Sequence, residues 1–81
     1  MKLEKAKKII TNEDLHGINW YNEDNLRENQ VGIKLKNGEW IVYVTDERAS
    51  VVLGSVIKFN SEEEALEVLI RKARCGKEIF G

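Results

Sequence analysis

The dipeptide Asn37-Gly38 constrains the fold of this chain more than any other feature. Both central residues of a type I′ turn need positive φ, and Asn followed by Gly adopts it readily, so antiparallel strands are expected on either side. The register counted outward from this turn pairs Lys36 with Glu39, Leu35 with Trp40, Lys34 with Ile41, Ile33 with Val42, Gly32 with Tyr43 and Val31 with Val44. Facing residues share one side of a sheet, so the pairs that include Leu35, Ile33 and Val31 form a wholly apolar side. We expect this side to face the core.

Helices are predicted at both ends of the chain. Apolar residues recur at helical spacing in residues 1–12, and this helix should end by Gly17, which can serve as a left-handed cap. The second helix should begin after Ser61, because Ser61 and Glu64 have the spacing of a capping box. Basic residues fill its last turns, and Gly76 is expected to end it.

Two further strands complete the predicted fold. Ile18 to Asn22 reads as a short strand before the polar loop Glu23 to Gln30, and Val51 to Phe59 reads as a longer one, with a bulge or close backbone approach at Gly54. The sequence therefore predicts an α+β fold in one domain over residues 1–81. It consists of an antiparallel sheet of three to four strands, with an N-terminal and a C-terminal helix packed on one face.

Composition argues against several classes of protein. Thirteen basic and fourteen acidic side chains give a net charge of -1, which does not favour a general binder of nucleic acid or anionic membranes. A single cysteine, Cys75, excludes an internal disulfide and suits a reducing compartment. No segment has the length and apolarity of a membrane span or signal peptide, so we expect a cytoplasmic protein.

No arrangement of residues predicts catalysis, a metal or another cofactor. His16 has no neighbour at metal-ligand spacing and is interpreted as an ordinary loop or helix-end residue. Cys75 has no histidine base in prospect and is interpreted as structural. The basic clusters at residues 2–8 and 71–77 lack interleaved aromatic residues, so we interpret them as solvated helix faces. We therefore do not expect an enzyme.

A possible binding surface lies on the other side of the predicted sheet. The hairpin register turns Ile41 and Tyr43 away from the core. Val52 and Val56 join them if Leu53, Ile57 and Phe59 point inward. Two interpretations remain open: a loop, a terminus or a second subunit covers these residues, or a partner binds them.

The polar connector that follows the hairpin is the second candidate. Asp46-Glu47-Arg48 joins the outer side at the sheet edge. It is either a polar turn with a local Asp to Arg pair or part of a partner-binding site.

Three segments of the chain resemble a known family. They are Val42 to Ser50, Gly54 to Val56 and Phe59 to Leu66. Together they are similar to the small immunity proteins of bacterial polymorphic toxin systems, most closely the type catalogued as immunity protein fifty-nine. The resemblance covers about half of the chain, and residues 22–30 match no pattern of this family.

This resemblance implies a non-catalytic α+β protein that inhibits a cognate toxin by tight binding. The expected partner is the C-terminal domain of a toxin that acts in the cytosol, and the immunity protein is expected to be a monomer or a homodimer. Aromatic residues and arginine are common interface anchors, and acids can imitate a substrate phosphate. The candidate contact residues are therefore Tyr43, Asp46, Glu47, Arg48 and Tyr21. The alternative is a small regulatory or structural module that binds nucleic acid or its own copy through an open sheet face.

Overall fold

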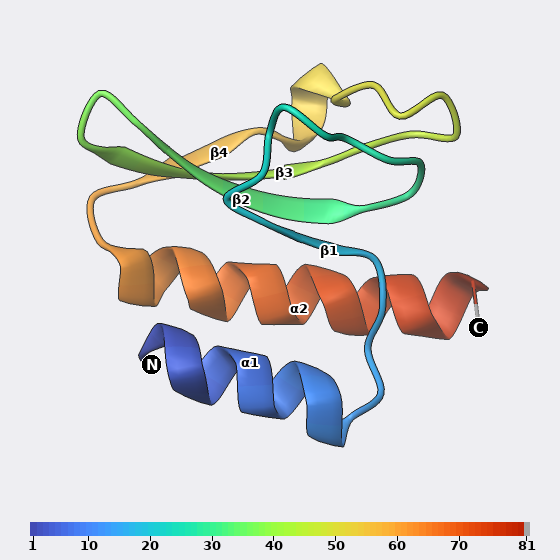
Figure 1. Cartoon of the computed structure of the whole chain (residues 1–81), viewed down its shortest axis with the longest axis horizontal. Helices are drawn as coiled ribbons and strands as arrows, with labels where there is room; N and C mark the ends of the chain where they lie inside the picture. The colour runs from blue at the N-terminus through green and yellow to red at the C-terminus, as the bar shows by residue number, and fades with distance from the viewer. Residues whose placement is uncertain (81) are drawn as a thin grey trace.

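The structure, a computed structural model, describes residues 1–80, with side chains described for residues 1–76. Its elements in chain order are α1 (Leu3–Asn12), β1 (Ile18–Trp20), β2 (Val31–Lys36), β3 (Glu39–Val44), the short 3₁₀ turn η1 (Leu53–Ser55), β4 (Ile57–Phe59) and α2 (Glu62–Phe80). The four strands form one sheet in the order β1-β2-β3-β4. Both helices lie on the same side of it, with α2 against the strands and α1 along α2 (Figure 1). The predicted α+β class, with both terminal helices on one face, is confirmed.

The hairpin has the predicted register. All six pairs from Lys36 with Glu39 to Val31 with Val44 are present. Asn37 has a φ of 53° and Gly38 a φ of 78°, the positive values that a type I′ turn requires.

The core lies between the helices and the apolar side of this hairpin. Its buried side chains are Ala6, Ile10, Leu15, Val31, Ile33, Val42, Ala65, Leu66, Leu69, Ile70 and Ala73. Trp40 is half-buried and packs against this cluster. The predicted apolar side is thus the core side, except that Leu35, close to the turn, stays 51% exposed.

Strand β1 forms where a strand was predicted, but its direction was not foreseen. It pairs with β2 in parallel through Ile18 with Val31 and Trp20 with Ile33, so the sheet is mixed and not antiparallel. Residues 21–30 return across the outer side of the sheet before β2 begins (Figure 1). A connection of this length is typical of antiparallel neighbours, because parallel neighbours usually need a longer crossover.

The predicted strand Val51 to Phe59 is mostly wrong. Only β4 pairs with β3, and Val51 makes a single isolated bridge with Thr45. The N–H of Val44 bonds the Oγ of Ser55 at 3.0 Å, so a side chain takes the place of a strand partner. The chain turns at η1 instead of bulging at Gly54, and Leu53 points outward with 87% of its surface exposed.

Helix α1 ends before the predicted glycine. Asp14 takes the left-handed conformation with a φ of 54°, and its N–H donates to the carbonyl of Thr11 at 3.2 Å. The N–H of Leu15 donates to the carbonyl of Ile10 at 2.9 Å, which completes a Schellman motif. Gly17 also has a positive φ, of 71°, but it lies beyond the cap.

Helix α2 starts as predicted and ends later than predicted. The N–H of Glu64 donates to the Oγ of Ser61 at 3.3 Å, the first half of the expected capping box. Gly76 does not end the helix, which continues to Phe80. A glycine in a helix costs only about 1 kcal/mol relative to alanine, so it permits a stop without enforcing one.

Candidate partner-binding surface

The outer side of the sheet is covered, which decides between the two interpretations left open by the sequence. Ile41 and Tyr43 are buried, Tyr43 with only 1% of its surface exposed. Residues 21–30 and 45–56 lie over this side, away from the helices (Figure 1). The patch is therefore closed by the chain's own loops. Tyr43 does not belong to the accessible surface on which the sequence led us to place it.

Tyr43 fits because its cross-strand neighbour is glycine. A Cβ added at Gly32 would lie 2.2 Å from Cζ of Tyr43, so the ring occupies the space of a side chain at position 32. Lys34 Nζ lies 5.5 Å from the centre of the ring. The Tyr43 hydroxyl has no hydrogen-bond partner among the described residues. Burial, and then the charge of Glu23, raise the pKa of this hydroxyl.

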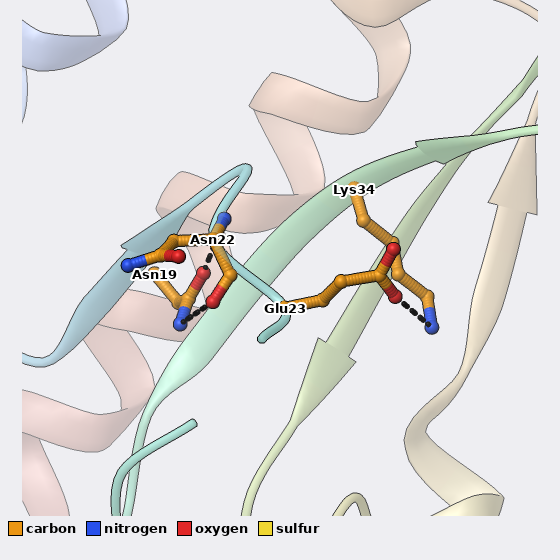
Figure 2. A network of polar contacts seen from close by, with 4 residues as sticks. All are labelled: Asn19, Asn22, Glu23 and Lys34. Atoms are coloured by element: carbon orange, nitrogen blue, oxygen red, sulfur yellow. Dashed lines mark hydrogen bonds and ion pairs between the residues drawn. The ribbon is translucent and has the colours of Figure 1, made fainter. Parts of the chain in front are cut away.

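The loop over Tyr43 is held at its start by Asn19, a buried polar residue of β1 (Figure 2). Asn19 Nδ2 donates to the carbonyl of Asn22 at 3.0 Å, and Asn19 Oδ1 accepts from the N–H of Asn22 at 2.9 Å. Next along the loop, the Glu23 carboxylate lies 3.2 Å from Lys34 Nζ of strand β2. These contacts fasten the first part of the loop to the sheet.

Thr45 joins this loop to the connector that follows β3. Its side chain is only 2% exposed. Its Oγ1 donates to the carbonyl of Arg27 at 2.6 Å and accepts from the N–H of Gln30 at 2.7 Å. The N–H of Thr45 donates to the carbonyl of Gln30 at 2.8 Å. A buried hydroxyl with both donor and acceptor satisfied is a strong geometric constraint.

Asp46 organises residues 45–50, which we call the connector loop. Its Oδ1 accepts hydrogen bonds from the N–H groups of Arg48 at 2.8 Å and Ser50 at 3.0 Å. Its backbone carbonyl accepts from Asn29 at 3.0 Å and from Ala49 at 3.1 Å. The pairing of Asp46 with position 48 therefore uses the backbone and not the guanidinium. The side chains of Glu47 and Arg48 are left exposed at the tip.

The connector loop borders a hollow of about 840 Å³ next to the end of α2 that carries residues 72–76. Its described lining consists of Asn29, Gln30, Val31, Val44, Thr45, Asp46, Glu47, Arg48, Lys72, Cys75 and Gly76. Within residues 1–76, neither the Arg48 guanidinium nor the Lys72 ammonium is in an ion pair. Among those residues both cations are available to an acidic group of a partner, while Glu47 can meet a basic one.

Tyr21 lies elsewhere. Its hydroxyl hydrogen-bonds the carboxylate of Glu62, at the start of α2, whereas the hollow adjoins residues 72–76 of that helix. Burial, and then the hydrogen bond to Glu62, raise the pKa of Tyr21. The structure therefore brings Asp46, Glu47 and Arg48 together, but it places Tyr21 near the opposite end of α2 and buries Tyr43.

His16 and Cys75 complete the sequence-derived candidates. His16 Nε2 lies 3.1 Å from Asp14 Oδ1, and both side chains are exposed. Cys75 is an exposed free thiol on the wall of the hollow. Within the described part of the chain, no group of three or more His, Cys, Asp and Glu residues could hold a metal ion. No helix of that same part is both long and apolar enough to cross a bilayer.

Sequence reasoning missed two residues of this surface. Thr45 had a readable signal, because it directly follows the apolar run Trp40 to Val44 and begins the polar segment after it. Lys72 had none, since its place on the hollow depends on how α2 crosses the sheet.

Comparison of the chain with protein-family models, curated proteins and solved structures finds no match.

Proposed function

We propose that this chain is an immunity protein that binds a cognate bacterial toxin domain in the cytosol and neutralises it without catalysis. The observation that carries the proposal is the connector loop, which presents exposed Glu47 and Arg48 on a fixed backbone beside an open hollow. The resemblance of the segments at residues 42–50, 54–56 and 59–66 to immunity proteins supports the same conclusion.

The connector loop has the preorganisation that tight binding requires. Asp46 and Thr45 hold its backbone through hydrogen bonds, so little conformational freedom is left to lose when a partner binds. Arginine is a frequent interface anchor, and Arg48 stands at the tip with Lys72 on the same hollow. A stable interface around it would bury on the order of 1,600 Å² in total.

The chemistry of the hollow favours binding over catalysis. Asp46 is a carboxylate on its wall, but two backbone N–H groups already occupy Oδ1. A general base needs a carboxylate that can approach a substrate proton, and the two bonds to Oδ1 fix the orientation of Asp46 within the loop. The remaining described polar side chains of the lining are amides, a buried hydroxyl, Glu47 and two cations, together with the Cys75 thiol.

The structure gives less support to the alternative function, which would use an open sheet face. A module that binds nucleic acid or a second copy through the open sheet face needs Ile41 and Tyr43 exposed, and both are buried beneath the chain's own loops. A cytosolic location remains part of the proposal, because a lone thiol suits a reducing compartment.

The proposal is tested by co-expression with the C-terminal domain of the long toxin protein that we expect the adjacent upstream gene to encode. The parent chain should rescue growth and form a complex with the toxin domain in a pull-down. The double variant Glu47→Lys/Arg48→Glu should weaken the complex by about 30-fold or more and abolish rescue, because it reverses both exposed charges at the tip.

The matched control is Glu63→Lys/Arg71→Glu, which makes the same two charge changes at exposed positions on α2. It should bind and rescue like the parent. If the parent chain neither binds nor rescues, the proposed function is wrong. If both double variants rescue equally, the function stands and the connector loop is not its contact surface.

A further inference from the structure

A run of apolar side chains is exposed at the edge of the sheet, directly after the connector loop. Leu53 is 87% exposed, Val52 42%, Ile57 40% and Val56 36%. We call residues 52–57 the apolar edge. Single exposed apolar residues are ordinary on protein surfaces, but several within one short segment are typical of an interaction site.

The apolar edge is a structured segment, so the backbone that carries these side chains is held in place. The N–H of Val52 donates to the carbonyl of Val44 at 2.9 Å. Ser55 Oγ accepts from the N–H of Val44 at 3.0 Å and donates to the carbonyl of Val52 at 2.6 Å. Leu53 therefore projects from the start of a pinned turn, which is the form an interface anchor takes.

The adjoining strand adds backbone groups that can pair. Strand β4 is the last strand of the sheet, and its far edge pairs with no other strand among the described residues. A free edge offers N–H and C=O groups to an added strand. Lys58, in the middle of β4, is exposed and belongs to no ion pair within residues 1–76.

The positive charge of Lys58 favours one kind of binding partner for this edge. In a two-fold antiparallel pairing centred on β4, Lys58 would face Lys58 of a second copy, and like charges directly opposite are destabilising. A different protein with an acidic residue opposite Lys58 would gain a complementary pair. The charge of the edge thus favours a partner of another sequence over self-association.

We propose that the apolar edge is a second contact surface for the toxin domain, whose apolar pocket receives Leu53 and whose acidic residue lies beside Lys58. This inference rests on the proposed function and extends it from the connector loop to the neighbouring sheet edge. The two surfaces follow each other directly in the chain, at residues 45–50 and 52–57.

The test measures binding of the purified full chain to the same toxin domain by isothermal titration. Leu53→Asp should weaken the complex by about 30-fold or more, since it places a charge in an apolar pocket. Leu35→Asp is the matched control, because Leu35 is an exposed leucine on β2 outside the apolar edge, and it should stay within about twofold of the parent. Lys58→Glu should weaken binding by about fivefold, with a smaller effect at high salt.

The possible results separate this inference from the proposed function. Circular dichroism first establishes that each variant is folded. If the parent binds and Leu53→Asp binds equally well, the apolar edge is not a contact surface, while the proposed function stands. If the parent does not bind at all, the function fails and this inference fails with it. If sedimentation of the free protein shows a dimer that Leu53→Asp dissociates, the occupant is a second copy and the inference is overturned.

Discussion

The two sides of the sheet are built by different means. On the helix side, aliphatic residues such as Ile33, Val42 and Leu69 fill the space, and the buried polar residues of the described chain, Asn19 and Thr45, are not among them. On the outer side, Tyr43 lies over Gly32, and loops held by buried polar groups such as Thr45 close the surface. Burial of apolar area stabilises both sides, and the outer side depends on hydrogen-bond geometry as well.

This difference determines how each side responds to substitution. Loss of apolar volume on the helix side removes free energy in proportion to the area and leaves a cavity. On the outer side, each hydrogen bond contributes only about 0.5–1.5 kcal/mol net, but a buried group that loses its partner costs about 1–3 kcal/mol. Three substitutions test this comparison, in order of decreasing effect.

Leu69→Ala should have the largest effect. Leu69 is fully buried between α2 and the sheet, and its truncation should lower the free energy of unfolding by about 2–5 kcal/mol. Urea denaturation measures this change. Leu53→Ala is the control at an exposed leucine and should change stability by less than about 0.5 kcal/mol. Equal midpoints for the two variants would mean that this face of α2 is not core.

Thr45→Val should cost about 1–3 kcal/mol, because it keeps the shape but leaves the carbonyl of Arg27 and the N–H of Gln30 without their partner. Thr11→Val removes an exposed hydroxyl that bonds only within α1, and it should be much milder. The N–H of Gln30 should also exchange faster with solvent in Thr45→Val. Unchanged exchange there would show that the hydroxyl does not fasten the loop.

Tyr43→Phe should have the smallest effect and the opposite sign. The hydroxyl is buried without a partner, so its removal should leave stability unchanged or raise it by up to about 1 kcal/mol. Gly32→Ala is the contrasting variant, since its methyl group would displace the same ring and destabilise the fold. A clear loss of stability in Tyr43→Phe would show that the hydroxyl has a partner in solution.

The sequence predicted the parts of the fold that depend on local chemistry. Asn37-Gly38 fixes its turn by itself, and the register of the hairpin follows from it. The direction of β1 depends on Asn19 and on the path of residues 21–30, which no local pattern contains. The turn at η1 depends on the hydroxyl of Ser55 replacing a backbone partner, so β-branched content alone predicted a strand.

The candidate site follows the same division. Asp46, Glu47 and Arg48 are neighbours in the chain, so their grouping needed no tertiary information. Lys72 joins them only through the packing of α2. The sequence also contains a signal for the burial of Tyr43. The register of the hairpin places Tyr43 opposite Gly32, and glycine is the one residue that leaves room for the ring.

The connector loop separates the residues that shape it from those that it displays. Asp46 and Thr45 hold the backbone, while Glu47 and Arg48 make no described side-chain contact on which the loop depends. Exposed positions of this kind tolerate replacement with little change in stability. Descendants of this chain can therefore diversify at positions 47 and 48 on an unchanged scaffold. If the proposed function holds, substitutions at these two positions can change which partner is bound while the fold stays the same.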